Sequence, residues 1–242
     1  MNLETAFTIA AKELKVLSRK KSIFAYIIIL PLLLTVGFSG IIQSQVAAGN
    51  SSTLSLGLDS LTYFFVVLAA ILPGSIAAYS IVGEKVEKSL EPLLATPTTD
   101  GEILLGKSIA AFVPPILSIW AGASIFMVAT DYIAHDLLSY YYFPNWTSGI
   151  MLLLLAPLAA MFSIELTVIV SSRVSDVRAA NQIGALMFIP FMAVFLAGAE
   201  GIITFGVDSL LVISGIVLIG DLALSFLSTS TFNREEILTK WK

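Results

Sequence analysis

The chain has 242 residues, of which 57% are hydrophobic and only 12% are charged, and its mean hydropathy is +0.93. A soluble domain carries roughly 25% charged residues, so this composition excludes an ordinary soluble protein and predicts a membrane protein. The sequence contains no cysteine, which excludes disulfides and thiolate metal sites. The formal net charge of −4 becomes informative only when the charges are placed along the chain.

The segment 1–22 precedes the first long apolar run and has the pattern of an amphipathic helix. Its apolar stripe, at three- and four-residue steps, consists of Leu3, Phe7, Ala10, Leu14 and Leu17. The other positions of this helix include Glu4, Lys12, Glu13 and Lys15. We expect the helix to lie in the membrane interface, with Arg19, Lys20 and Lys21 near the lipid headgroups.

Six stretches are apolar enough and close enough to the roughly 20 residues that a membrane span needs. They lie at about 23–45, 62–83, 108–130, 150–171, 183–199 and 209–228. Glycines and Glu200 interrupt the sequence after the fifth stretch, so residues 195–210 are a candidate re-entrant hairpin, which requires protein to cover its backbone. The sequence therefore predicts a single all-α membrane domain over residues 1–242.

The basic residues predict the orientation of this domain. When the segments outside the spans are numbered alternately from the N-terminus, all 13 Lys and Arg residues fall on one side. Basic residues accumulate on the cytoplasmic side of membrane proteins. We therefore expect both termini to be cytoplasmic and the chain to lie in the cell (plasma) membrane.

Residues 101–108, GEILLGKS, match the phosphate-binding pattern G-x-x-x-x-G-K-[ST]. A true phosphate loop follows a buried strand, whereas TPTTD precedes this match and a membrane span follows it. We interpret the match as chance and expect the chain not to be an enzyme. In this interpretation Asp100 caps a helix, residues 103–105 enter the bilayer, and Lys107 snorkels at the cytoplasmic face.

The same region belongs to a 24-residue cytoplasmic loop, 84–107, with charged ends. Its apolar centre consists of Leu90, Leu93 and Leu94. Proline is favoured in the first turn of a helix, so Pro92 could open a short helix that runs to about Thr96. Such a helix is too short to be stable alone and needs a partner surface. The alternative is a loop folded against the bilayer.

This loop resembles a segment in the permease subunits of ABC-type exporters of the type-2 family, which includes drug, polysaccharide and sodium exporters. The family pattern runs from an acidic stretch to Ser/Thr-Leu-Glu, Leu-Leu, Thr-Pro and acidic-Ile-Leu-Leu-Gly-Lys. The matching residues are Ser89, Leu90, Glu91, Leu93, Leu94, Thr96, Pro97, Glu102, Ile103, Leu104, Leu105, Gly106 and Lys107. A second stretch, SSRVSDVRAANQIG at 171–184, is similar to the family's loop between spans four and five. The chain departs from some relatives in having no large extracellular domain and no fused ATPase.

The resemblance implies that a coupling helix from this loop docks into a cleft of a separate ATPase subunit. The residues that it would use are Glu91, Leu93, Leu94, Thr96 and Pro97. Two ATPase copies would rock two permease subunits, identical or homologous, between inward- and outward-facing states. ATP and Mg would bind to the ATPase, and we expect no cofactor on this chain. The lipid bilayer is the remaining expected partner, and nucleic acid is not one.

Two carboxylates lie within predicted spans. Glu165 is six residues and Asp221 seven residues from the cytoplasmic ends of their spans, which places both about 9–10 Å deep. Such residues are candidates for an ion or proton path, or for a hydrogen-bonded pair that holds spans four and six together. An alternative function is therefore an ATPase-independent carrier that uses this pair, or an immunity or assembly scaffold. With His135 as the only histidine, we expect no metal site.

Overall fold

The computed structural model describes the chain except for residues 1, 50, 87–97, 175, 187 and 232–242. The described part contains helices and no strand, which confirms the predicted all-α class. The helices are α1 (Leu3–Arg19), α2 (Lys21–Ala47), α3 (Ser51–Ala69), α4 (Leu72–Val86), α6 (Asp100–Leu138), α7 (Trp146–Ile150), the π-helical segment η1 (Met151–Leu155), α8 (Ala156–Arg173), α9 (Val177–Ala185), α10 (Phe188–Ala199) and α11 (Val207–Thr231).

Six stretches in the described residues are long and apolar enough to cross a membrane, which confirms the number of predicted spans. The first and last are the continuous helices α2 and α11, which contain the predicted ranges 23–45 and 209–228. The second is built from α3 and α4, which meet at residues 70–71, and the fifth from α9 and α10. Two of the spans are therefore broken helices.

Helix α6 differs most from the prediction. It has 39 residues, which corresponds to about 58 Å and exceeds the roughly 30 Å of a bilayer's hydrocarbon core. It includes residues 100–107, which the sequence analysis assigned to the cytoplasmic loop. Because α4 continues to Val86, the connection between α4 and α6 is limited to residues 87–99.

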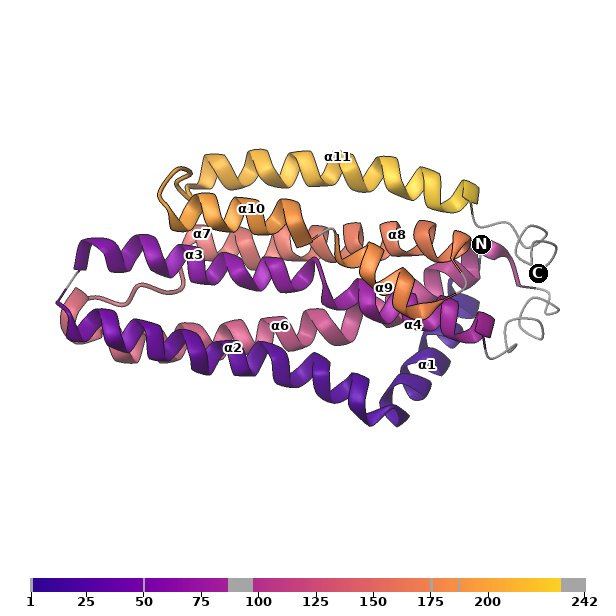
Figure 1. The fold of residues 1–242 in the computed structure, drawn as a ribbon, viewed down its shortest axis with the longest axis horizontal. Helices are drawn as coiled ribbons and strands as arrows, with labels where there is room; N and C mark the ends of the chain where they lie inside the picture. The colour runs from indigo at the N-terminus through magenta and orange to yellow at the C-terminus, as the bar shows by residue number, and fades with distance from the viewer. Residues whose placement is uncertain (1, 50, 87–97, 175, 187, 232–242) are drawn as a thin grey trace.

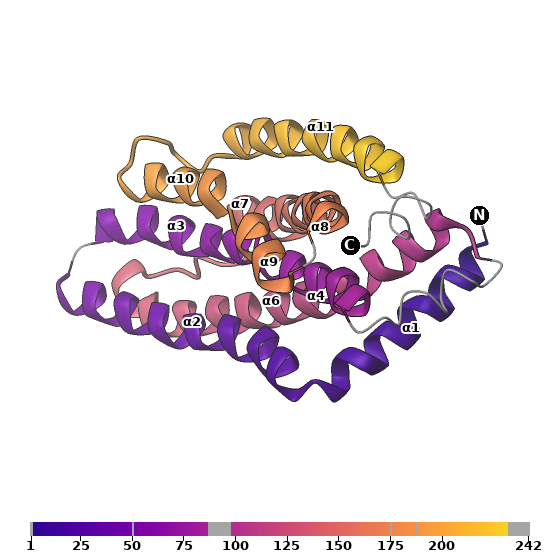
Figure 2. The ribbon, with the colours of Figure 1, turned by 45° about the vertical axis from the view of Figure 1, so that its right-hand side comes forward.

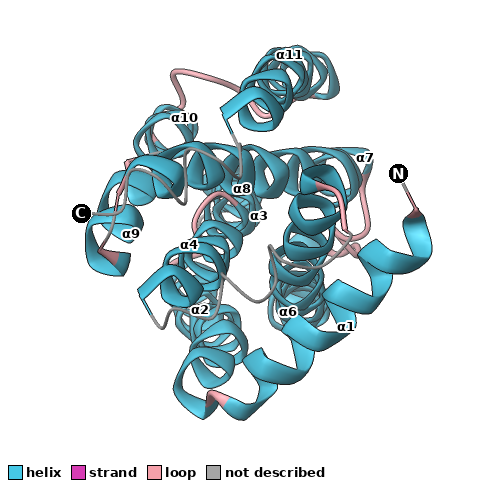
Figure 3. Cartoon of the chain, turned by 90° about the vertical axis from the view of Figure 1, so that its right-hand side faces the viewer, coloured by secondary structure: helices cyan, strands magenta, loops and turns pink. Residues whose placement is uncertain are grey.

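The long helices run side by side along one axis, and α1 leaves this bundle at an angle (Figure 1). Helix α1 lies at one end of the molecule, where it crosses the beginning of α6 (Figures 2 and 3). The end of α4 and the end of α11 lie at the same end of the bundle (Figure 1). With an even number of spans, the first and last described residues, Asn2 and Thr231, are expected on the same side of the membrane. The cytoplasmic location of this end stays a prediction.

The α3–α4 span forms the centre of the bundle. In this span, Gly57–Gly83, 83% of an 18-residue apolar stretch is buried inside the protein. The corresponding share is 17% in the peripheral span Val207–Ser228. Three phenylalanines fasten neighbouring helices to it: Phe38 of α2, Phe65 of α3 and Phe126 of α6, with ring centroids 5.6 to 6.3 Å apart. Phe38 packs edge to face on both other rings, which adds stability beyond the buried area.

Helix α6 also supplies side-chain donors to two carbonyls that a proline, four or five residues later, leaves without a helical donor. Pro31 lacks an N–H, so the carbonyl of Ile27 loses its helical donor, and Ser118 Oγ donates to that carbonyl at 2.8 Å. In η1, where i to i+5 bonds are formed, Pro157 removes the donor for Leu152 in the same way. Trp120 Nε1 donates to the Leu152 carbonyl at 2.8 Å. These bonds fix α2 and η1 to α6 within the apolar bundle.

The face of α1 that packs on the bundle is rotated relative to the predicted stripe. Its buried residues are Ala6, Ile9, Ala10, Glu13 and Leu17. Leu3 and Phe7, which belong to the predicted stripe, remain 57% and 61% exposed. The prediction of a helix over this segment is therefore correct, but the prediction of its buried face is only partly correct, and its location in the membrane interface stays a prediction.

Residues 195–210 form the end of α10, a connection at 200–206 and the start of α11. This connection lies at the end of the bundle opposite α1 (Figure 1). Phe205 anchors it, because this residue is 8% exposed and its ring stacks on Tyr63 with centroids 4.8 Å apart. The re-entry of this segment into the membrane stays a prediction.

Candidate functional site: the junction of α1, α4 and α6

The predicted coupling residues lie outside the described part of the chain. They are Glu91, Leu93, Leu94, Thr96 and Pro97. The structure does describe both flanks of this segment, namely α4 up to Val86 and the chain from Thr98 into α6. The candidate site is therefore the place where these flanks meet α1.

Helix α6 begins with a capping box. Thr99, and not Asp100 as predicted, is the N-cap: its Oγ1 accepts from the backbone N–H of Glu102 at 3.4 Å. The Glu102 carboxylate returns the interaction by accepting from the backbone N–H of Thr99 at 3.0 Å. Such reciprocal bonds satisfy amides that have no partner in the first turn of a helix. The beginning of α6 is thus fixed close to the end of the predicted coupling segment.

Glu102 also joins α6 to the beginning of α1. Its second oxygen, Oε1, accepts from the backbone N–H of Asn2 at 2.6 Å. The Asn2 side chain in turn caps α1 by accepting from the backbone N–H of Glu4 at 3.1 Å. One carboxylate therefore caps α6 and positions the N-terminal end of α1.

Gly106 allows α1 and α6 to approach closely. A Cβ atom at this position would lie 2.7 Å from the carbonyl oxygen of Ala6 and 2.8 Å from the Cβ of Ile9. Contacts this short are not formed by real side chains, so only glycine fits here. Small residues at helix crossings in membrane proteins allow the same close backbone approach.

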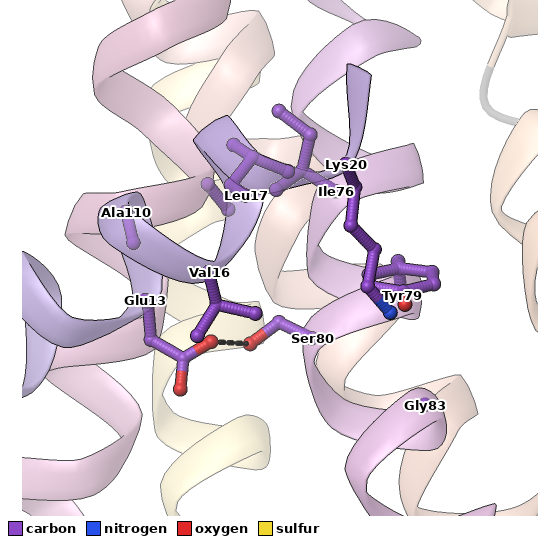
Figure 4. A pocket seen from close by; sticks show the side chains of 10 residues that line it. Glu13, Val16, Leu17, Lys20, Ile76, Tyr79, Ser80, Gly83 and Ala110 are labelled. Carbon is purple, nitrogen blue, oxygen red and sulfur yellow. Dashed lines mark hydrogen bonds between the residues drawn. The ribbon is translucent and has the colours of Figure 1, made fainter. Parts of the chain in front are cut away.

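Lys107 closes the junction one residue further along α6. Its side chain is 2% exposed, and its Nζ lies 3.0 Å from both the carbonyl oxygen and the Oγ of Ser80, on α4. The same ammonium donates to Oε1 of Glu13, on α1, at 3.4 Å. Ser80 Oγ donates to the other Glu13 oxygen at 3.0 Å (Figure 4). The prediction that Lys107 snorkels to the cytoplasmic surface is therefore wrong.

We call Glu13, Ser80 and Lys107 the polar junction. A charge buried in an apolar bundle is costly unless it is paired and hydrogen-bonded. Here one positive and one negative group, from two helices, share a hydroxyl from a third. Glu13 was predicted outside the apolar stripe of α1, yet it is only 7% exposed. A cavity of about 40 Å³ beside it is large enough for a water molecule.

Lys20 lies on the same side of α1 as the polar junction. Its Nζ is 4.2 Å from the centre of the Tyr79 ring, the residue before Ser80 on α4 (Figure 4). A cation over an aromatic face is attracted by about 0.5–1 kcal/mol at exposed sites and more when desolvated. Lys20, predicted near the lipid headgroups, thus also fastens the end of α1 to α4.

The GEILLGKS match is helical throughout. Residues 101–108 belong to the first turns of α6, where the backbone N–H groups beyond the first turn are used within the helix. They cannot form the open loop of amides that holds a phosphate. Ile103 and Leu104 also pack inside the protein, with 0% and 9% exposure. Their predicted entry into the bilayer stays a prediction.

The two intramembrane carboxylates lie on α8 and α11, which pack against each other. Asp221 is 6% exposed, and neither of its carboxylate oxygens has a hydrogen-bond partner among the described residues. The same holds for Oε2 of Glu165, and the two groups are close enough for their charges to interact. The predicted roles of this pair as a structural link or an ion path both stay predictions.

Sequence reasoning missed Glu13 and Ser80. A signal for Glu13 was present, because it lies four residues from both Ile9 and Leu17 and so shares their helix face. Ser80 carries no comparable signal, since a serine in an apolar span can bond to its own helix, to another helix or to no side chain at all. The predicted second motif is partly described: Asp176 caps α9 by accepting from the backbone N–H of Arg178 at 2.8 Å.

Comparison with known proteins adds the family. A family model of the ABC-2 family transporter proteins matches residues 7–242. A comparison with curated proteins gives no match. The matched range includes all six spans and the motif that builds the junction of α1 and α6. The chain therefore belongs to the ABC-2 family of transporter proteins and is a membrane-embedded permease subunit.

Proposed function

We propose that this permease is half of the membrane part of an ATP-driven exporter, and that residues 84–107 receive the force of a separate ATPase subunit. Family membership and six spans support this role. The proposal assigns ATP and Mg to the ATPase, present in two copies, and no cofactor to this chain. A second permease, identical or homologous, completes the pathway in the plasma membrane, with the termini of each chain in the cytoplasm.

The junction of α1, α4 and α6 is the observation that supports this function most directly. Glu102, Gly106 and Lys107, which resemble the exporter motif, each contact α1. The segment proposed to dock on the ATPase connects α4 to α6, and both helices are fixed to α1 by the polar junction. A displacement of that segment would therefore move three helices together, since packed elements move as rigid units.

In this mechanism the chain itself makes and breaks no covalent bond. Closure of the two ATPase subunits on ATP would pull the two coupling segments together. Each junction would pass this movement to α4 and α6, which belong to the second and third spans. The two permeases would then alternate between states open to either side of the membrane. ATP binding supplies the free energy only through its preference for one of these states.

The coupling contact is tested by the Leu93→Ala/Leu94→Ala variant. If these two side chains fill a pocket on the ATPase, the burial of each contributes roughly 1.5–3 kcal/mol to the free energy of binding. The variant is expected to insert into the membrane normally, because neither residue lies in a span. It is expected to lose the ATPase when the complex is purified in a mild detergent and quantified by mass spectrometry.

Leu153→Ala is the matched control. Leu153 lies within a span and is 70% exposed on the bundle surface, so its truncation removes the same atoms at a place away from the junction. It should leave ATPase binding and transport unchanged. If the Leu93→Ala/Leu94→Ala variant retains the ATPase and transports at the original rate, the segment is only a loop and the coupling proposal is wrong.

A further inference from the structure

A pocket of about 340 Å³ lies between α6, α8 and α11, at the end of the bundle that carries α1. Its walls are mainly apolar and include Leu104, Ile109, Phe112 and Ile164. Along α6 the lining extends from Gly101 to Val113, which corresponds to about 18 Å of helix. Pockets that bind small molecules typically have about 300–1,000 Å³ and apolar walls with a few polar groups.

Glu165 is the one charged residue among those that line this pocket. Its Oε2 is buried and has no hydrogen-bond partner among the described residues. Of the serines of α11 that line the pocket, Ser225 donates to the Leu222 carbonyl and Ser228 to the Ser225 carbonyl, each at 3.1 Å. The pocket therefore presents a hydrogen-bond acceptor without a donor.

Lys107, the lysine of α6, does not pair with the Glu165 carboxylate. Lys107 precedes the pocket residue Ser108, but its ammonium is directed to Glu13 and Ser80 on the other side of α6. An ionised carboxylate in an apolar surrounding is stable only when a cation or several donors pair with it. Asp221 of α11, whose carboxylate oxygens also have no partner among the described residues, adds a second acceptor and no positive charge. A positively charged donor from outside the described residues would therefore suit this place.

We propose that this pocket binds a hydrophobic molecule that carries one ammonium group. The ammonium pairs with Glu165, and the apolar part lies along α6 between Leu104 and Phe112. A charge-assisted bond to the carboxylate gives selectivity for the cation, whereas burial of the apolar part provides most of the affinity. This inference goes beyond the proposed exporter role, because such binding requires neither ATP nor the ATPase.

The test is equilibrium binding of tritiated dodecylammonium, a primary ammonium with three N–H donors, to the full chain, purified in a neutral detergent without ATP. The wild-type chain is expected to bind this cation saturably, and Glu165→Gln is expected to weaken binding at least tenfold. Tritiated dodecanol, a neutral molecule with the same alkyl chain, is expected to show no difference between the two chains. Glu200→Gln, the same substitution in the exposed connection after α10, is the matched control and should bind like wild type.

Ser108→Phe fills the pocket without removing the charge and is also expected to abolish saturable binding. Thermal unfolding of each variant shows that the compared chains are folded. The proposal is overturned if the wild-type chain shows no saturable binding, if folded Glu165→Gln or Ser108→Phe binds like wild type, or if dodecanol binds as tightly as the cation. These results are independent of ATPase docking, so failure here and failure of the proposed function are distinguishable.

Discussion

At the scale of single residues, Lys107 and Glu13 form an ion pair inside the protein. Replacing a whole buried ion pair by apolar residues is often neutral or stabilising, whereas removal of one partner leaves an uncompensated charge and costs about 3–5 kcal/mol. Glu13 has one further basic neighbour, since Lys12 Nζ lies 3.6 Å from its Oε1, and the Lys12 side chain is 50% exposed. This partly solvated contact can offset only a fraction of the loss.

We therefore expect Lys107→Met to destabilise the protein by about 3 kcal/mol, at the lower end of that range. Glu13 would remain 7% exposed, with Ser80 and the half-exposed Lys12 as its neighbours. The measurement is the free energy of unfolding of the purified permease in mild detergent. The Glu13→Leu/Lys107→Met double variant removes both charges and should recover most of the lost stability. Equal stability of the wild type and Lys107→Met would show that the pair contributes nothing.

The sequence shows that Lys107 and Glu13 carry opposite charges, but it does not show that they pair with each other. Lys107 was expected at the membrane surface because a single lysine next to an apolar run usually extends to the headgroups. Its partner Glu13 is 94 residues away in the chain, and the hydroxyl that joins them comes from a third helix. Such a contact depends on how α1 crosses α6, which hydrophobic periodicity does not determine. The four-residue spacing of Glu13 from Ile9 and Leu17 does indicate a shared helix face, but the predicted stripe did not include it.

At the scale of elements, the crossing of α1 and α6 depends on the absence of a side chain at Gly106. Glycine inside a helix normally costs up to about 1 kcal/mol relative to alanine. Here an added methyl group would meet the Ala6 carbonyl oxygen at 2.7 Å, and backbone atoms of a packed helix cannot move away easily. The steric cost of overpacking, typically 1–3 kcal/mol, should therefore exceed the gain in helix propensity.

Gly106→Ala is expected to loosen α1 from α6 and to expose Lys12, Lys15 and Arg19 to faster cleavage by trypsin. Gly215→Ala is the control, because Gly215 lies within α11 and has no atom within 4 Å of an added Cβ. The control should leave the cleavage rate of α1 unchanged and should not lower the thermal stability. A Gly106→Ala protein that resists trypsin like wild type would show that the two helices separate without cost.

The six spans could be predicted because each contains a long apolar run, and the bilayer imposes that length. The ends of α6 could not be predicted in the same way. Asp100, Glu102 and Lys107 interrupt the hydropathy signal, although Glu102 caps the helix and Lys107 is paired inside the protein. Helix extent beyond the apolar run thus depends on capping and tertiary contacts. The predicted coupling residues lie outside the described chain and stay predictions.

At the scale of the whole molecule, three features gather at one end of the bundle: the polar junction, the pocket beside Glu165 and the flanks of the predicted coupling segment. All 13 basic residues belong to segments on the side of the membrane that the sequence analysis assigns to this end. The proposed ATPase acts from the cytoplasm, so the exporter mechanism requires this end to be cytoplasmic. The orientation of the whole molecule is therefore a condition of the function.

The orientation can be tested by single cysteines, since the native chain contains none. Ser55 and Ser139 lie in the predicted outer segments, and Ser89 and Ser175 in the predicted cytoplasmic ones. A membrane-impermeant maleimide added to intact cells should label Ser55→Cys and Ser139→Cys, because basic residues keep the opposite side in the cytoplasm. Ser89→Cys and Ser175→Cys should react only after the membrane is permeabilised, which also serves as the control for their reactivity. Labelling of Ser89→Cys in intact cells would reverse the topology and would place the coupling segment out of reach of any cytoplasmic ATPase.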